Sequence, residues 1–228
     1  MAVKNGKLIV IEGTDGSGKK TQSKLLLERL NNGGIISKTF SFPDYDSPTG
    51  KVISMYLGKN GFNREFGISN EVNPKIASTW YAFDRFSKKH EIEYSLENNC
   101  NVILDRYVDS NAGHQGGKFI NPEERNAFFD WLYWLEYNNF GMPKPDITIF
   151  LYMPYEMSNA LRINRGEAED GHESSEVHLR RAEASYLSLV KRNEWKKINC
   201  IDNSDNLRTK EDISEEVYKK VIPVLIRD

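Results

Sequence analysis

Five short runs of apolar residues recur along the chain, and segments with helical spacing separate them. The first run, residues 7–13, ends in glycine and predicts a buried strand followed at once by a turn. Further strands are predicted at residues 35–42, 101–105, 147–152 and 198–202. Because strands alternate with helices over the whole length, the pattern favours an α/β fold with a mostly parallel sheet that helices cover on both faces.

The helical segments carry their own start and stop signals. Residues 18–30 place leucines on one stripe, and the sequence Asn-Asn-Gly-Gly that follows ends the helix. Asn73-Pro74 supplies an N-cap and a first-turn proline for a long helix through residues 75–96, and Asn121-Pro122 opens another helix in the same way. The apolar face of this last helix is expected to lie in the core and contains Trp131, Trp134 and Leu135.

The chain shows no repeat and no low-complexity tract, so we expect one domain over residues 1–228. Its expected architecture is a three-layer αβα sandwich around a five-stranded parallel sheet. The polar, glycine-containing stretch at residues 164–176 is expected to be a mobile loop inside this domain and not a linker.

The composition excludes several classes of protein. The 228 residues are 39% hydrophobic and 28% charged, with 31 basic against 33 acidic side chains, which argues against disorder and against a polybasic nucleic-acid surface. The longest aliphatic run, residues 8–11, is far shorter than the roughly 20 residues of a membrane span, and the first residues contain no apolar signal segment. We therefore expect a cytoplasmic protein that binds neither nucleic acid nor membrane. Cys100 and Cys200 are expected to be small buried side chains and not metal ligands.

Residues 13–19 match the phosphate-binding pattern GxxxxGK, directly after the first predicted strand and at the start of the first helix. In such a P-loop, glycines turn backbone N–H groups toward phosphate oxygens, and the lysine, here Lys19, reaches the β and γ phosphates. The alternative is a glycine-rich turn with an exposed lysine, which the flanking strand and helix disfavour. The predicted nucleotide-phosphate site comprises Gly13, Asp15, Gly16, Ser17, Gly18, Lys19, Lys20 and Thr21.

A candidate metal ligand follows the third predicted strand. Asp105 is expected at the carboxyl end of the sheet, where open α/β sheets hold ligands, and it suits the acid that fixes Mg²⁺ directly or through water. An aspartate after a strand is by itself more often a turn residue, but beside a P-loop the metal role is favoured. Lys20 stands where a Ser or Thr normally offers Mg²⁺ a hydroxyl, and Thr21 comes one place later.

Several segments together resemble the thymidylate kinase family, the dTMP kinases of the nucleoside monophosphate kinase group. They are IEGTDGSGK with Asp15 in the loop, Phe42-Pro43, the sequence YAFDR at 81–85, and DRY at 105–107 followed by Ser110, Asn111, Gln115 and Gly116. A further stretch that begins at Arg165 resembles the family's lid, here about residues 162–176. The resemblance spans residues 7 to about 202, and the order of the segments matches the family throughout.

The resemblance implies transfer of the γ-phosphoryl group of Mg²⁺-ATP to dTMP, giving dTDP for dTTP synthesis, by a homodimer as in most members of the family. Catalysis is implied for Lys19, Arg106 and Arg165, and the lid residues Arg162 and Arg165 are implied to contact ATP. Tyr81 and Arg85, four residues apart on one helix face, are implied to hold thymine. The whole acceptor site implied by the resemblance is Asp15, Phe42, Tyr45, Tyr81, Arg85, Arg106, Ser110, Asn111, His114 and Gln115.

Three positions depart from the family pattern. Lys20 replaces the hydroxyl residue after the P-loop lysine, which weakens the metal assignment. Tyr45 stands where the family places an arginine after Phe-Pro, which weakens the acceptor-phosphate clamp. Two groups are candidates to compensate for that arginine: the Tyr45 hydroxyl, which we expect to matter more, and Lys51. His114 stands where a tyrosine commonly precedes the Gln-Gly pair, close to the position that excludes ribose.

The residues alone leave other interpretations open. Tyr81 also fits a core stripe with Ile76, Trp80 and Phe83, and Arg85 and Arg106 also fit solvated surface charges. The histidines outside the motifs, His90, His172 and His178, are expected at the surface. A kinase for another nucleoside monophosphate or for a deoxynucleoside is the nearest alternative function. A nucleotide-binding protein that has lost catalysis is the alternative from a different class.

Overall fold

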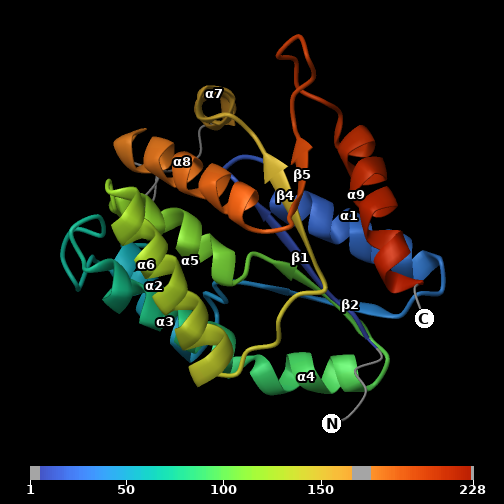
Figure 1. Ribbon diagram of the computed structural model, residues 1–228, viewed down its shortest axis with the longest axis horizontal. Helices are drawn as coiled ribbons and strands as arrows, with labels where there is room; N and C mark the ends of the chain where they lie inside the picture. The colour runs from blue at the N-terminus through green and yellow to red at the C-terminus, as the bar shows by residue number, and fades with distance from the viewer. Residues whose placement is uncertain (1–5, 166–175, 227–228) are drawn as a thin grey trace.

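The computed structural model describes residues 6–165 and 176–226, and the side chains of residues 162–165 lie outside this description. One parallel sheet forms the centre of the molecule, with the strand order β2-β3-β1-β4-β5. The predicted five-stranded parallel sheet is therefore confirmed (Figure 1). The strands are β1 (Leu8–Gly13), β2 (Ser37–Ser41), β3 (Asn101–Asp105), β4 (Ile147–Tyr152) and β5 (Lys196–Asn199).

Helices cover both faces of this sheet, as the sequence predicts for a three-layer sandwich (Figure 1). One face packs on α1 (Lys19–Asn32) and α9 (Lys210–Leu225), through an apolar cluster that includes Leu26 and Val217. The opposite face packs on α4 (Lys89–Glu97), α5 (Val108–His114), α6 (Pro122–Tyr133) and α8 (Glu176–Arg192). Every residue of β1 is buried, which is why its run is uninterruptedly apolar except for Glu12.

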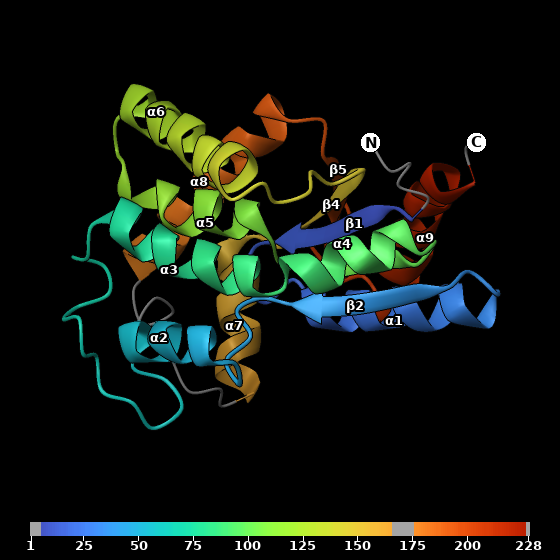
Figure 2. The same ribbon diagram turned by 90° about the horizontal axis from the view of Figure 1, so that it is seen from below.

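Three helices lie beyond the carboxyl ends of the strands. The arrowheads of β1 and β2 point toward α2 (Pro48–Leu57), α3 (Pro74–Ser87) and α7 (Tyr155–Arg165) (Figure 2). A separate apolar cluster joins α2 to α3 and includes Ile53, Tyr56 and Ala77. The region between these helices and the sheet edge is where an open α/β sheet holds its ligands.

The predicted helix starts are confirmed, but the long helix after Asn73 is two helices. The Asn73 side chain accepts a hydrogen bond from the backbone N–H of Lys75, and Asn121 accepts one from Glu123. The chain bends at Lys88 between α3 and α4. Helix α3 packs on α2 beyond the sheet edge, whereas α4 packs beneath the sheet. Because the apolar spacing continues through the bend, it did not reveal the change of partner.

The prediction that Trp134 lies in the core is wrong, because α6 continues into a π-helical turn. This turn, η2 (Trp134–Asn139), replaces i→i+4 by i→i+5 hydrogen bonding and so rotates the side chains that follow. Trp134 is 55% exposed and Trp131 is half-buried, while Leu135 and Glu136 face inward. The inward position of Glu136 matters for the site described below.

The last strand and some buried side chains also differ from expectation. Strand β5 spans Lys196–Asn199 and not residues 198–202; the next residue, Cys200, still donates its N–H to Tyr152 of β4. Cys200 is buried as predicted, but Cys100 is only half-buried. The histidines divide as well, since His90 is exposed and His178, expected at the surface, is buried.

Membrane-spanning helices were also sought in the described ranges. Within residues 6–165 and 176–226, no helix combines the length and the apolarity needed to cross a membrane.

Candidate active site

The P-loop connects β1 to α1 and is held close to the sheet. Gly16 and Gly18 have φ angles of 73° and 84°, which a residue with a side chain rarely adopts. A Cβ on Gly13 would lie 2.5 Å from the carbonyl oxygen of Leu151, so β4 packs directly on the loop. The Thr14 hydroxyl donates to the Met153 carbonyl at 2.7 Å, which fixes the loop to the end of β4.

Lys19 lies inside this loop and not on the surface. Its Nζ donates to the carbonyl oxygens of Gly13 at 3.0 Å and Thr14 at 2.8 Å, and the side chain is 6% exposed. Burial and the nearby Arg106 guanidinium lower the pKa of Lys19 to about 8. The alternative of a glycine-rich turn with an exposed lysine is therefore wrong.

The loop after β3 lies beside the P-loop, because β1 and β3 are neighbours in the sheet. Arg106 has a φ angle of 68°, in the left-handed region that costs a non-glycine residue backbone strain. Its N–H donates to the Ile11 carbonyl, and the next N–H, of Tyr107, donates to Glu12 at 2.7 Å. This turn directs the Arg106 side chain toward the P-loop.

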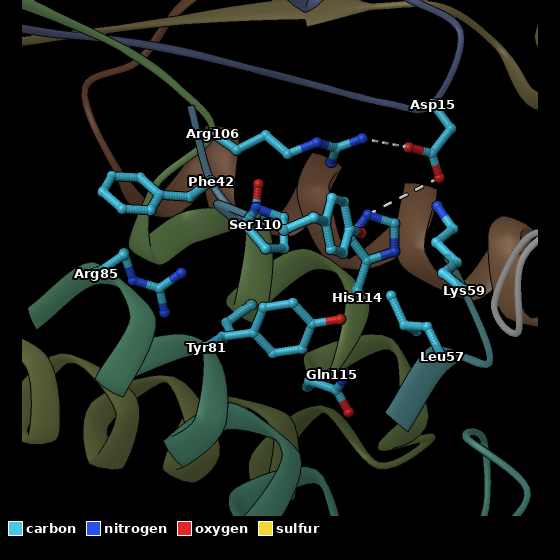
Figure 3. Close-up of a pocket in the computed structure, with 13 residues that line it drawn as sticks. Asp15, Phe42, Leu57, Lys59, Tyr81, Arg85, Arg106, Ser110, His114 and Gln115 are labelled. Atoms are coloured by element: carbon cyan, nitrogen blue, oxygen red, sulfur yellow. Dashed lines mark hydrogen bonds and ion pairs between the residues drawn. The ribbon is translucent and has the colours of Figure 1, made fainter. Parts of the chain in front are cut away.

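Asp15 is the point at which three nitrogen-bearing side chains meet. Arg106 Nη2 lies 2.9 Å from Asp15 Oδ1, His114 Nε2 lies 3.8 Å from Oδ2, and Lys19 Nζ lies 3.9 Å from Oδ1. Burial would raise the pKa of Asp15, but these three groups hold it well below its ordinary value. Figure 3 shows Arg106 and His114 both extending toward Asp15. The cluster joins the P-loop to α5.

One cleft contains every residue predicted for the acceptor site. Tyr81 and Gln115 lie across the cleft from Asp15 and Arg106 (Figure 3). The cleft is also lined by Pro43, Leu57 and Lys59, which the sequence analysis did not assign to the acceptor site. The predicted residues that line it are Asp15, Phe42, Tyr45, Tyr81, Arg85, Arg106, Ser110, Asn111, His114 and Gln115.

Arg85 lines this cleft and forms a buried ion pair. Its guanidinium is 2% exposed and donates to both carboxylate oxygens of Glu136 and to the Tyr107 carbonyl. The alternative that Arg85 is a solvated charge is therefore wrong. The core stripe offered as an alternative for Tyr81 also fails, because Ile76 and Phe83 are more than half exposed.

Asp84, the residue before Arg85, holds the loop that carries Tyr45. It accepts hydrogen bonds from the Asp44 N–H at 2.9 Å, the Ser47 hydroxyl at 3.1 Å and the Thr49 hydroxyl at 2.8 Å. Lys59 Nζ lies 5.5 Å from the centre of the Tyr45 ring. Lys51, by contrast, is exposed on α2 and does not line the cleft.

Glu12 is a buried carboxylate beside the P-loop that the sequence analysis missed. It is fully buried and accepts hydrogen bonds from the Tyr107 N–H at 2.7 Å and the Ser110 hydroxyl at 2.8 Å. Burial raises the pKa of Glu12, and the Tyr107 and Ser110 hydrogen bonds oppose that rise. A carboxylate inside an otherwise apolar strand was the available signal, because such a charge needs built-in partners. The sequence does not predict that Glu136 is buried, because its inward position depends on the π-helical turn.

Few side chains near the P-loop and the end of β3 offer oxygen ligands for a metal ion. Asp105 is 7% exposed and accepts a hydrogen bond from the Ser41 hydroxyl at 3.3 Å. Lys20 and Thr21 are exposed at the start of α1. Among the residues that the structure describes, no group of three or more His, Cys, Asp or Glu side chains forms a metal-binding cluster. The backbone of Arg162 and Arg165 lies at the end of α7, but their side chains and the rest of the predicted lid lie outside the described residues.

Comparisons with known proteins match the chain over most of its length. A family profile described as thymidylate kinase matches residues 11–213. The thymidylate kinase of Plasmodium falciparum is 30% identical over 231 residues, covering 98% of this chain and 93% of that protein. That of Dictyostelium discoideum is 28% identical, covering 96% and 89%. The solved structure of the Candida albicans enzyme, 23% identical, aligns with a TM-score of 0.74 over 98% of this chain and 96% of that one.

The charge cluster at Asp15 predicts a dependence of stability on pH. The folded-state pKa of Asp15 lies below the unfolded value, so its stabilisation is present above about pH 4 and is lost as the pH falls further. We expect Asp15→Asn to lower the free energy of unfolding by about 1–3 kcal/mol between pH 5 and 7, and the difference to shrink below pH 4. Urea denaturation at a series of pH values measures it. Asp46→Asn, at an exposed acid, is the control; a difference that does not vary with pH would contradict the prediction.

Proposed function

Because the chain belongs to the thymidylate kinase family, which phosphorylates dTMP to dTDP with ATP, we propose that the cleft beside the P-loop is its dTMP site. One observation carries this proposal: the residues expected to bind dTMP come from four separate segments and line a single cleft, in which Asp15 lies 3.9 Å from Lys19. The cleft lies where the ends of β1 and β3 meet. A donor bound at the P-loop and an acceptor bound in the cleft would therefore lie next to each other.

The proposed residue roles depend on where negative charge develops during transfer of the phosphoryl group. An oxygen of the dTMP phosphate forms a bond to the γ phosphorus while the bond from that phosphorus to the β-phosphate oxygen breaks and ADP leaves. Negative charge gathers on the oxygens between the two phosphates, and Lys19 and Arg106 are proposed to neutralise it, which their position at the P-loop supports. Arg165, and Arg162 beside it, are proposed to act from the lid on the donor side. No protein nucleophile is needed.

The far wall of the cleft is proposed to hold the thymine ring. Tyr81 and Phe42 supply aromatic surface, and Arg85 lies at the same wall. The buried pair with Glu136 fixes the Arg85 guanidinium in one position, and a fixed donor discriminates between bases better than a mobile one. Ser110, Asn111 and Gln115 are proposed as further polar contacts to the nucleotide, and His114 with Asp15 as the groups nearest the sugar.

The residues near the P-loop fit Mg²⁺. This ion commonly uses one or two carboxylates and completes its shell with phosphate oxygens and water, so a single acid at this position suffices. Asp105, at the carboxyl end of β3, would hold it directly or through water. The ion, when bound, supplies positive charge to the β and γ phosphates.

A homodimer is proposed on an exposed aromatic surface. Phe83 and Phe86 of α3 are 56% and 42% exposed, and their rings are stacked with centroids 6.4 Å apart. Large exposed apolar groups that cluster on one side are typical of protein interfaces. A single domain over residues 1–228, a lid at about 162–176 and a cytoplasmic location stay predictions from the sequence.

The role of Lys19 is tested against another lysine of the same helix. We expect Lys19→Met to lower kcat about 100-fold or more, because its ammonium stabilises charge in a site with little water. Lys24→Met removes an equal charge from the exposed face of α1 and should change kcat less than threefold. A coupled assay of ADP release, with and without dTMP and with Mg²⁺ or EDTA, measures both variants. Equal effects of the two substitutions would contradict the P-loop assignment.

Lys59 is expected to compensate for the arginine that Tyr45 replaces. It lines the cleft next to Tyr45, so its ammonium can attract the dTMP phosphate. Lys59→Gln should raise the KM for dTMP about five- to tenfold, with a smaller change in kcat. Lys51→Gln, at an exposed lysine outside the cleft, should leave KM unchanged. A rise in KM with Lys51→Gln and none with Lys59→Gln would contradict this prediction, because the phosphate would then bind near Lys51 of α2.

The dimer is tested by sedimentation velocity. Phe83→Glu places a charge in the proposed interface and should convert the protein to monomers at micromolar concentration. Ile36→Glu changes a residue that is 66% exposed next to β2 and should leave the dimer intact. Circular dichroism checks that both variants fold. A wild-type protein that sediments as a monomer would contradict the proposal.

A further inference from the structure

Tyr186 of α8 carries a buried hydroxyl with which no described residue pairs. The residue is 1% exposed, and its oxygen makes no hydrogen bond to residues 6–165 or 176–226. The nearby Ser110 hydroxyl donates to Glu12 instead. Buried polar side chains are normally paired, so this hydroxyl points to an arrangement of its neighbours in which it gains a partner.

The ring of Tyr186 is fixed against α5, the helix that carries His114. A Cβ on Gly113 would lie 2.3 Å from the Tyr186 Cζ atom, so the ring packs directly on bare backbone. The hydroxyl of Ser185, one residue before, donates to the Ala112 carbonyl at 2.8 Å and joins the two helices. Because the ring cannot move far, its hydroxyl can pair only with groups that lie beside it.

Those groups belong to the charge cluster at Asp15. Tyr186 and Asp15 line the same crevice beside the P-loop. The His114 ring, whose Nε2 lies 3.8 Å from Asp15, meets the Tyr186 ring edge-on with centroids 5.7 Å apart. Burial raises the pKa of Tyr186 well above its ordinary value; Glu12 and Asp15 add to that rise, and Arg106 opposes it. The hydroxyl therefore keeps its proton and stays a hydrogen-bond donor.

Asp15 has one hydrogen bond that the reaction can take away. Among the described residues, only Arg106 donates to its carboxylate, at 2.9 Å, because Lys19 and His114 lie 3.9 and 3.8 Å from it. The phosphates carry more negative charge than one carboxylate and attract the Arg106 guanidinium more strongly. When Arg106 turns to them, this largely buried carboxylate loses its hydrogen bond, which is costly unless another donor replaces it.

We propose that Tyr186 is a positioning residue for phosphoryl transfer: its hydroxyl donates to Asp15 when Arg106 turns from Asp15 to the phosphates. The exchange removes the cost of leaving Asp15 unpaired, so Arg106 is held on the phosphates for a larger part of the time. Tyr186 does not itself touch the nucleotides, because it does not line the dTMP cleft. This inference rests on the role proposed above for Arg106.

Tyr186→Phe tests the exchange, because it removes the hydroxyl and keeps the ring. We expect kcat with dTMP to fall about five- to twentyfold, and the KM for dTMP to change less than threefold. Because the hydroxyl has no described partner in the free protein, the midpoint of urea denaturation should stay the same or rise. The coupled assay of ADP release and urea denaturation measure these effects.

Tyr152→Phe is the matched control, since it removes a tyrosine hydroxyl that is paired. The Tyr152 hydroxyl donates to Glu183 of α8 at 2.7 Å, so its loss should lower the urea midpoint and change kcat less than about twofold. If Tyr186→Phe behaved like this control, with a lower midpoint and an unchanged kcat, the hydroxyl would be merely structural and the inference would be overturned.

Arg106→Gln separates this inference from the proposed function. Alone it should lower kcat at least about 50-fold, and adding Tyr186→Phe should lower kcat less than twofold further, because no exchange on Asp15 then takes place. An Arg106→Gln variant with full activity would overturn the role proposed for Arg106 and this inference with it. An impaired Arg106→Gln beside a fully active Tyr186→Phe, or a double variant that shows both losses in full, would overturn this inference alone.

Discussion

The active-site arrangement depends on one buried carboxylate, that of Glu12. It lies inside β1, the strand that leads into the P-loop, and it accepts hydrogen bonds from Tyr107 and Ser110 at the start of α5. A fully buried carboxylate is costly unless several donors satisfy it, so this position forces the loop after β3 to close on β1. The closure directs Arg106 toward Asp15. The phosphate-binding loop and the acceptor cleft are joined by this contact.

Buried charges also position the outer wall of the cleft, which lies beyond the sheet. Arg85 is held by Glu136 from the π-helical turn, and the neighbouring Asp84 holds the loop with Tyr45. Apolar packing between α2 and α3 is limited to a small cluster. The Arg85–Glu136 ion pair and the hydrogen bonds to Asp84 therefore determine the position of this wall relative to the sheet. A buried ion pair adds little net stability but tolerates few alternative geometries, and that restriction suits the thymine-binding role proposed for this wall.

The two halves of the site differ in how they are built. The P-loop binds phosphate with consecutive backbone groups and one lysine, so its chemistry is contained in a single short segment. The proposed acceptor cleft is lined by side chains from segments far apart in the chain, so a charge missing at one position can be supplied from another. Lys59 is the proposed case, because it lies beside Tyr45 in space and fourteen positions further along the chain.

The sequence by itself determined the α/β class, the parallel sheet, the P-loop and the family, because these depend on local patterns: apolar runs, capping residues and glycines at fixed spacing. It also indicated which residues form the acceptor cleft, through motifs whose order the resemblance supplied. Only the tertiary structure decided that Arg85 pairs with Glu136, that Lys59 and not Lys51 lies in the cleft, and that Trp134 points outward. Those outcomes depend on a π-helical turn, a bend at Lys88 and contacts between distant segments. Hydrophobic periodicity contains no information about them, since it records which face of an element is apolar and not which element that face meets.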